Sequence, residues 1–142
     1  MMTEYLCIRE YLRALLTLYN EFEGKARASF EGDLQGLGLE ELPGTATEEC
    51  AGLKRQTTWP RQDFAVVQLT RGNIAFLATA LAQPDLLGPE GRIIHTQIEM
   101  DGELAFAACD NFHEECTYAS GALRQQIVEV LTRNGLASWL RH

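Results

Sequence analysis

Apolar residues recur at alternating spacings of three and four over the first 28 positions of the chain. The residues on this stripe are Tyr5, Ile8, Leu12, Leu15, Tyr19, Phe22 and Ala26. Such spacing is typical of one face of a helix, so we predict a helix over residues 3–28 with Thr3 as its N-cap. A second apolar row beside the first makes this face broad. The helix therefore either sinks into its own core or offers one flank to a second copy of the chain.

Residues 31–61 show no hydrophobic period. Five glycines and two prolines interrupt the segment, and both residue types favour turns over regular elements. Its leucines nevertheless distinguish it from a flexible linker. We predict a long ordered loop, which in a compact domain usually has a function.

Strand-like patterns dominate the middle of the chain. Residues 63–69 form a short apolar run rich in β-branched side chains, which predicts a strand. Two alternating runs, 92–100 and 103–110, flank the dipeptide Asp101-Gly102, which favours a tight β-hairpin. We expect this hairpin to pair with the strand at 63–69.

Capping residues mark two further helices. Thr70 and Ser120 are suitable N-caps, and Gly135 is a suitable stop for the last helix. The residues of the tail expected to lie back on the core are Leu136, Trp139 and Leu140. Together these elements predict a single α+β domain over residues 1–142. In it an antiparallel sheet containing the hairpin is covered by N-terminal, middle and C-terminal helices.

The stretch AACDNFHEECTYAS, residues 107–120, gathers side chains that can hold metals or act as nucleophiles. His113 and Cys116 have a short ligand-like spacing, but zinc needs about four ligands and the sequence offers no second cluster. A Cys–His nucleophile is also disfavoured, because Glu114 and Glu115 oppose formation of a thiolate. We therefore predict no metal, no cofactor and no enzymatic activity. The simpler interpretation is a polar turn that Phe112 anchors inward.

Charge is distributed unevenly along the chain, whose net charge is −8 at neutral pH. Two segments, 31–49 and 99–115, each contain six acidic residues and no lysine or arginine, so together they carry −12. An acidic, solubilising surface is one explanation. The other is a single negative face built from both segments, which would steer a basic partner and repel the phosphates of nucleic acid.

We predict that this face binds a basic protein, such as a toxin or a nucleic-acid enzyme, and that the chain is an immunity or antitoxin-like inhibitor. Its carboxylates would occupy positions where phosphates otherwise bind. The alternative is a small-molecule-binding protein or dimeric structural adaptor that uses the broad apolar face of helix 3–28. The residues predicted to contact the partner are Glu40, Glu41, Glu48, Glu49, Trp59, Asp110, Phe112, Glu114 and Glu115.

Nothing in the sequence indicates a membrane protein. No stretch approaches the roughly 18 uncharged apolar residues that a membrane span needs. Charged residues interrupt the first apolar run, so it does not read as a signal peptide. We expect a cytoplasmic protein whose four cysteines are reduced.

Overall fold

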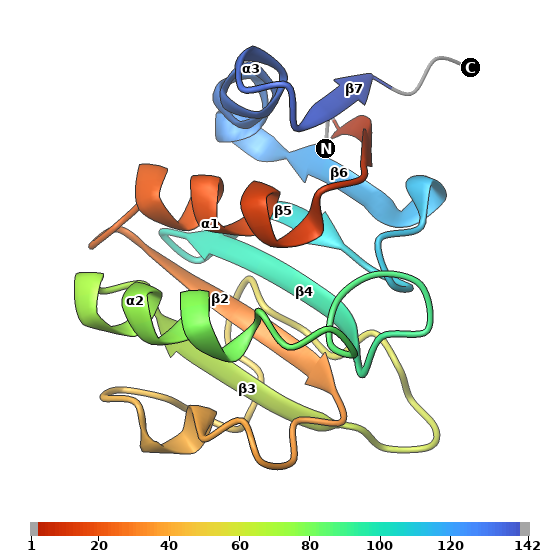
Figure 1. The fold of residues 1–142 in the computed structure, drawn as a ribbon. Helices are drawn as coiled ribbons and strands as arrows, with labels where there is room; N and C mark the ends of the chain where they lie inside the picture. The colour runs from red at the N-terminus through yellow and green to blue at the C-terminus, as the bar shows by residue number, and fades with distance from the viewer. Residues whose placement is uncertain (1–2, 140–142) are drawn as a thin grey trace.

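Seven strands form one antiparallel sheet in the computed structural model, which describes residues 3–139. The strands are β1 (Thr3–Ile8), β2 (Ala26–Gly32), β3 (Asp63–Gln68), β4 (Ile93–Met100), β5 (Glu103–Ala108), β6 (Thr117–Ser120) and β7 (Ala137–Trp139). The α-helices are α1 (Tyr11–Glu21), α2 (Arg71–Ala80) and α3 (Arg124–Arg133), and the 3-10 turns are η1 (Leu39–Glu41), η2 (Glu114–Cys116) and η3 (Gly121–Leu123). The helices lie on one face of the sheet (Figure 1). The predicted single α+β domain is thus confirmed. Within residues 3–139 no helix is long and apolar enough to cross a bilayer.

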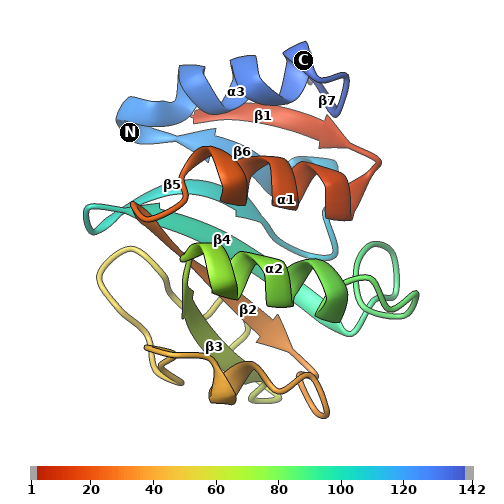
Figure 2. The same cartoon turned by 60° about the vertical axis from the view of Figure 1, so that its left-hand side comes forward.

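The sheet, in the order β3-β2-β4-β5-β6-β1-β7, consists of two similar halves on either side of β5. Strands β3 and β4 are joined through α2 and flank β2, whereas β6 and β7 are joined through α3 and flank β1. The remaining helix, α1, connects β1 in one half with β2 in the other. Figure 2 shows all three helices covering the same face, so the core lies on that side.

The core is formed between these helices and the sheet. Tyr19 of α1 meets Phe30 of β2 edge-on, with ring centroids 6.4 Å apart. Leu15 of α1, Leu77 of α2 and Phe106 of β5 are also fully buried in this cluster. Burying an apolar side chain of this size contributes about 1.5–3 kcal/mol, so the helix-covered face supplies most of the stabilisation.

The predicted helix over residues 3–28 is wrong at both ends. Residues 3–8 form strand β1, and residues 26–28 begin strand β2. Only residues 11–21 are α-helical. Thr3 is therefore not an N-cap, and the long apolar helix face on which the adaptor alternative depended does not exist.

The error has a local physical cause. A short strand and a helix place some of the same apolar residues inward, and in β1 the buried pair is Leu6 and Ile8, two positions apart. Gly24, with a φ of 78°, then takes the left-handed conformation that glycine allows and reverses the chain after α1. Its N–H donates to the carbonyl of Leu69, which fixes the start of β2 beside β3.

The hairpin is confirmed, but its neighbour is not the predicted one. Strands β4 and β5 pair around Asp101 and Gly102, whose φ values of 53° and 80° give a tight turn of two left-handed residues. On its other side β4 pairs with β2, and β3 lies outside β2. The expected pairing of the hairpin with residues 63–69 is wrong, because β2 was not predicted: its residues fell at the end of the predicted helix 3–28 and the start of the predicted loop 31–61.

Of the three capping residues predicted for the two later helices, two act as expected. The Oγ1 atom of Thr70 accepts a hydrogen bond from the N–H of Asn73 at 3.2 Å and caps α2. Gly135, with a φ of 69°, ends α3. Ser120 does not cap α3, because η3 lies between them and Ser120 makes no capping side-chain hydrogen bond.

The tail follows the prediction only in part. Leu136 is buried in the core, whereas Trp139 at the end of β7 is 55% exposed. Leu140 lies outside the described residues.

Residues 50–57, which we call the strap, cross the second face of the sheet behind β2 and β4 (Figure 1). Backbone N–H groups of the strap donate to side chains of the two strands: Gly52 to Glu99 (2.7 Å), Lys54 to Gln97 (3.1 Å), and Gln56 and Thr57 to Glu31 (2.7 and 3.2 Å). Glu31 and Glu99 are each 1% exposed. These two acids therefore hold the strap and add nothing to the negative surface.

Candidate functional site

Residues 110–115, which we call the acidic turn, leave β5 through an unusual backbone conformation. Asp110, Asn111 and Phe112 have φ values of 50°, 56° and 64°, three consecutive non-glycine residues in the left-handed region. Asparagine and aspartate tolerate this region, but a bulky side chain such as phenylalanine rarely enters it. Backbone strain of this kind persists only where the surroundings enforce it, and it is concentrated at functional sites.

Contacts from three directions hold the acidic turn. The side-chain amide of Asn111 donates to the carbonyls of Gly91 (3.0 Å) and Ile93 (3.3 Å). The ring of Phe112 is 7% exposed and lies 4.7 Å from that of Tyr11 at the start of α1. The turn is therefore a fixed feature of the surface. Phe112 points inward, as the simpler interpretation predicted, so its ring is not an exposed anchor for a partner.

His95 joins the acidic turn to the strap. Its Nδ1 atom accepts a hydrogen bond from the N–H of Asp110 at 3.0 Å, so the ring proton sits on Nε2 and donates to Oγ1 of Thr57 at 2.7 Å. Burial lowers the pKa of His95 below its usual value, although the charges of Glu31 and Asp110 act in the opposite direction. The neutral ring is thus the form that holds both segments.

Acidification is expected to destabilise the protein through His95. Because its pKa is lower in the folded state than the ordinary value of about 6.5, the unfolded chain binds the proton more readily. This contribution to stability is complete above about pH 6.5 and declines as the pH falls below that value. Urea denaturation at pH 7.5 and 5.5 measures the change. His95→Asn should show a smaller loss than the native chain, and equal losses would contradict the assignment.

The acidic turn presents carboxylates that the protein itself leaves unpaired. Asp110, Glu114 and Glu115 are exposed. Among residues 3–139 none of them forms an ion pair. Arg92, in the segment that Asn111 contacts, is already paired with Asp33 (3.3 Å) and Asp85 (3.5 Å). Within residues 3–139 these three carboxylates are therefore exposed to solvent and not neutralised by an ion pair.

His113 and Cys116 take part in hydrogen bonds that hold the backbone of this segment. Nδ1 of His113 accepts a hydrogen bond from the N–H of Glu115 at 3.1 Å, and its carbonyl accepts from the N–H of Cys116 at 2.9 Å. In the part of the chain that the structure describes, no three His, Cys, Asp or Glu side chains are arranged to hold a metal ion.

The other predicted acids lie along the 33–62 loop and have basic neighbours. Glu40, Glu41, Glu48 and Glu49 are exposed. Glu40 and Glu48 line a hollow of about 500 Å³ beside β3, together with Arg55 and Arg61. Glu48 lies 3.8 Å from Arg61, and Glu49 accepts a hydrogen bond from the N–H of Arg55. Charge on this side is therefore partly compensated.

The two acidic segments do not form the single negative face that was expected. Asp101 and Glu103 lie at the hairpin end of β5, whereas the acidic turn follows its other end. Six strand residues separate these ends by about 20 Å. Glu40 and Glu41 lie beyond β3, three strands from β5 in the sheet, or about 15 Å. The acids thus form separate patches, and within residues 3–139 the three exposed acids of the acidic turn form no ion pair.

Trp59 is an exposed aromatic side chain just beyond the end of the strap. It is 84% exposed and follows Thr57, the strap residue bonded to His95, by two positions. Two residues span at most about 7 Å. Trp59 and Asp110 therefore belong to the same end of the molecule.

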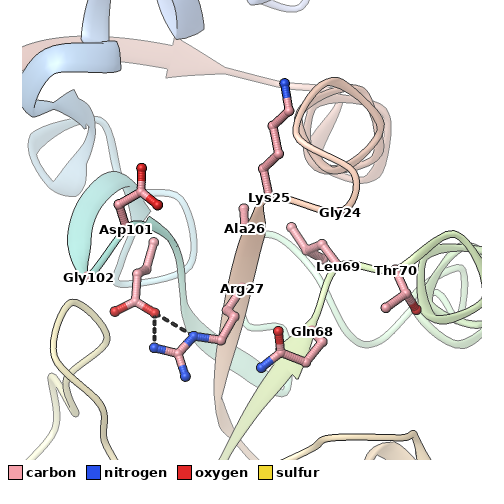
Figure 3. Close-up of a pocket in the computed structure, with 10 residues that line it drawn as sticks. Gly24, Lys25, Ala26, Arg27, Gln68, Leu69, Thr70, Asp101 and Gly102 are labelled. Atoms are coloured by element: carbon pink, nitrogen blue, oxygen red, sulfur yellow. Dashed lines mark hydrogen bonds and ion pairs between the residues drawn. The ribbon is translucent and has the colours of Figure 1, made fainter.

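A second hollow, of about 380 Å³, lies at the opposite end of β2 near the hairpin turn. Nε of Arg27 donates to the buried carboxylate of Glu99 at 2.7 Å. In Figure 3, Lys25 extends away from Arg27, so the two basic groups do not converge on one ligand position. Sequence reasoning missed this pair, as it missed His95, because neither shows a spacing motif.

Comparison with known proteins adds no assignment to this geometry. No protein family, curated protein or solved structure matched the chain significantly.

Proposed function

We propose that this protein binds a basic protein through the acidic turn and neutralises it, as an inhibitor of a toxin or nucleic-acid enzyme would. One observation carries the proposal. Asp110, Glu114 and Glu115 are exposed and unpaired within residues 3–139, on a turn whose backbone is held in an unfavourable conformation.

Rigidity makes such a surface suited to binding. A flexible acidic loop loses conformational entropy when a partner orders it, whereas a turn fixed in advance avoids most of that cost. Asn111, Phe112 and His95 fix the turn from three sides, and none of these contacts uses a carboxylate of the three presented acids. The strain of the turn therefore serves presentation of charge.

Charge and an aromatic neighbour indicate the kind of partner. Three like charges steer a cationic surface into contact and repel phosphate, so a basic protein is favoured over nucleic acid. Trp59 is of the residue type most enriched among binding hot spots. A cationic cleft that normally holds phosphate groups would accept the carboxylates in their place.

The adaptor alternative is not proposed. It rested on the broad apolar face of a helix over residues 3–28, and that helix is a strand, a shorter helix and a second strand. The buried residues of α1, which include Leu15, Leu18 and Tyr19, lie within the protein's own core.

Charge reversal tests the proposal. Glu114→Lys/Glu115→Lys should reduce capture of a basic protein from extracts of the native host and slow its association about tenfold at low salt, with less difference at higher salt. Glu21→Lys/Glu23→Lys, the same charge change at the exposed end of α1, is the matched control and should leave capture unchanged. Affinity capture followed by stopped-flow or surface-binding kinetics measures both. An acidic partner, or equal association rates for the two variants, would refute the proposal.

A further inference from the structure

Two cysteines face each other where the acidic turn begins and ends. Strands β5 and β6 pair with Ala108 opposite Thr117, so the next register position sets Cys109 opposite Cys116. The N–H of Cys109 donates to the carbonyl of Cys116 at 3.0 Å, which shows that the ladder continues to this pair. Residues directly opposite on an antiparallel ladder project their side chains to the same face.

The separation of such a pair suits a disulfide. Opposite residues at a hydrogen-bonded position have Cα atoms about 5.5 Å apart. Disulfides span Cα separations of about 4.4–6.8 Å, so the backbone does not need to move far. Both cysteines are free thiols in the structure.

We propose that Cys109 and Cys116 are a reversible thiol-oxidation site, at which a low-molecular-weight disulfide converts the pair into an intramolecular bond that closes the acidic turn at its base. The site does not depend on the partner proposed above. The β1–β6 ladder, which would set Cys7 toward Cys116, ends with Tyr5 opposite Tyr118, two positions earlier, so among the described residues only Cys109 and Cys116 are two cysteines joined by a backbone hydrogen bond. Cys7 lies opposite Ser138 in the β1–β7 ladder, and the thiol of Cys50 contacts the carboxylate of Glu99.

The reaction proceeds by two exchanges. The thiolate of Cys116, the more exposed of the two, attacks one sulfur of the small disulfide and releases one small thiolate. Cys109 then loses its proton to solvent and attacks the Cys116 sulfur, which releases the second small thiolate. Two protein thiols are oxidised and one small disulfide is reduced to two thiols.

The second exchange is the slow one. Burial raises the pKa of Cys109 to about 12, and the charges of Cys116, Glu31 and Asp110 act in the same direction. The phenol of Tyr118 lies in the same cluster, where burial first, and then Cys109, Tyr5 and Cys116, raise its own pKa. Because the reactive form of Cys109 is its thiolate, ring closure should accelerate about tenfold per pH unit between pH 7 and 9.

Neutral hydroxyethyl disulfide is the suitable probe, since the acidic turn would repel an anionic one. Treated protein is alkylated and then mapped by mass spectrometry. The expected result is a mass loss of about 2 Da and one linked peptide pair containing Cys109 and Cys116, with Cys7 and Cys50 alkylated. A reducing agent should restore the original mass.

The variant Cys116→Ser should show no mass loss after treatment, and its Cys109 should remain a free thiol. The variant Cys7→Ser should form the Cys109–Cys116 bond as the native chain does. A Cys116 mixed disulfide that persists at pH 9 would overturn the proposal. So would linkage through Cys7 or Cys50, or full alkylation of all four cysteines after treatment.

Discussion

Gly32→Ala is expected to destabilise the fold by at least about 4 kcal/mol, the largest effect of any single substitution we predict. Gly32 ends β2 with a φ of 151°, a conformation that side chains rarely adopt. A Cβ atom there would lie 2.1 Å from the carbonyl oxygen of Arg92 and 3.0 Å from Cα of Ile93. Both contacts are backbone atoms, so rotation of a side chain cannot relieve them.

The control for Gly32 is Gly36→Ala. Gly36 also has a positive φ, of 80°, but no atom lies within 4 Å of the position that an added methyl group would occupy. Its cost should be about 1 kcal/mol, which isolates backbone strain from collision. Urea unfolding of both variants gives the comparison. If Gly32→Ala costs no more than Gly36→Ala, the close approach of β2 to the start of β4 is not as described.

Glu99→Ala is expected to cost about 3 kcal/mol. The Glu99 carboxylate pairs with Arg27 and accepts a hydrogen bond from the N–H of Gly52, so its loss leaves a cation and a strap donor without a partner. The Arg27 side chain is 34% exposed and reaches water, which keeps the cost below that of a fully buried pair. Unfolding by urea measures it.

Glu103→Ala, an exposed acid on the same hairpin, should change stability by no more than about 0.5 kcal/mol. The strap should also loosen selectively in Glu99→Ala, seen as faster hydrogen exchange at the amides of Gly52 and Lys54. Unaltered exchange there, with native stability, would show that the strap does not depend on Glu99.

The features that local pattern predicted are those with a local cause. Asp101-Gly102 favours a tight turn by its own backbone preferences, and Thr70 caps α2 through an atom three residues away. The strand identity of residues 3–8 is different, because it depends on pairing with β6 and β7 near the other end of the sequence. A six-residue segment does not carry enough periodicity to decide between helix and strand.

In the candidate site, too, the sequence predicts the features with a local cause and misses those that depend on distant residues. Exposure of Glu114 and Glu115 follows from their charge, and the sequence indicates it. Burial of Glu31 and Glu99 does not, because it requires the strap's N–H groups, which only the folded chain brings to them. The conformation of Phe112 likewise depends on Tyr11, about a hundred residues earlier in the chain.

The sheet order has a consequence for how the chain is made. β1 is synthesised before every other strand, yet its neighbours in the sheet are β6 and β7, which are synthesised last. Contacts so distant in sequence slow folding, because a long loop must close before they form. During translation β1 therefore has no strand paired to either of its edges, and an unpaired edge is a template for pairing with another chain. All strands of the half built from β3, β2 and β4 are synthesised before β6 and β7. Until α3 and β7 have been synthesised, the nascent chain therefore has one half of the sheet whose strands can all pair, and a β1 strand without both of its neighbours.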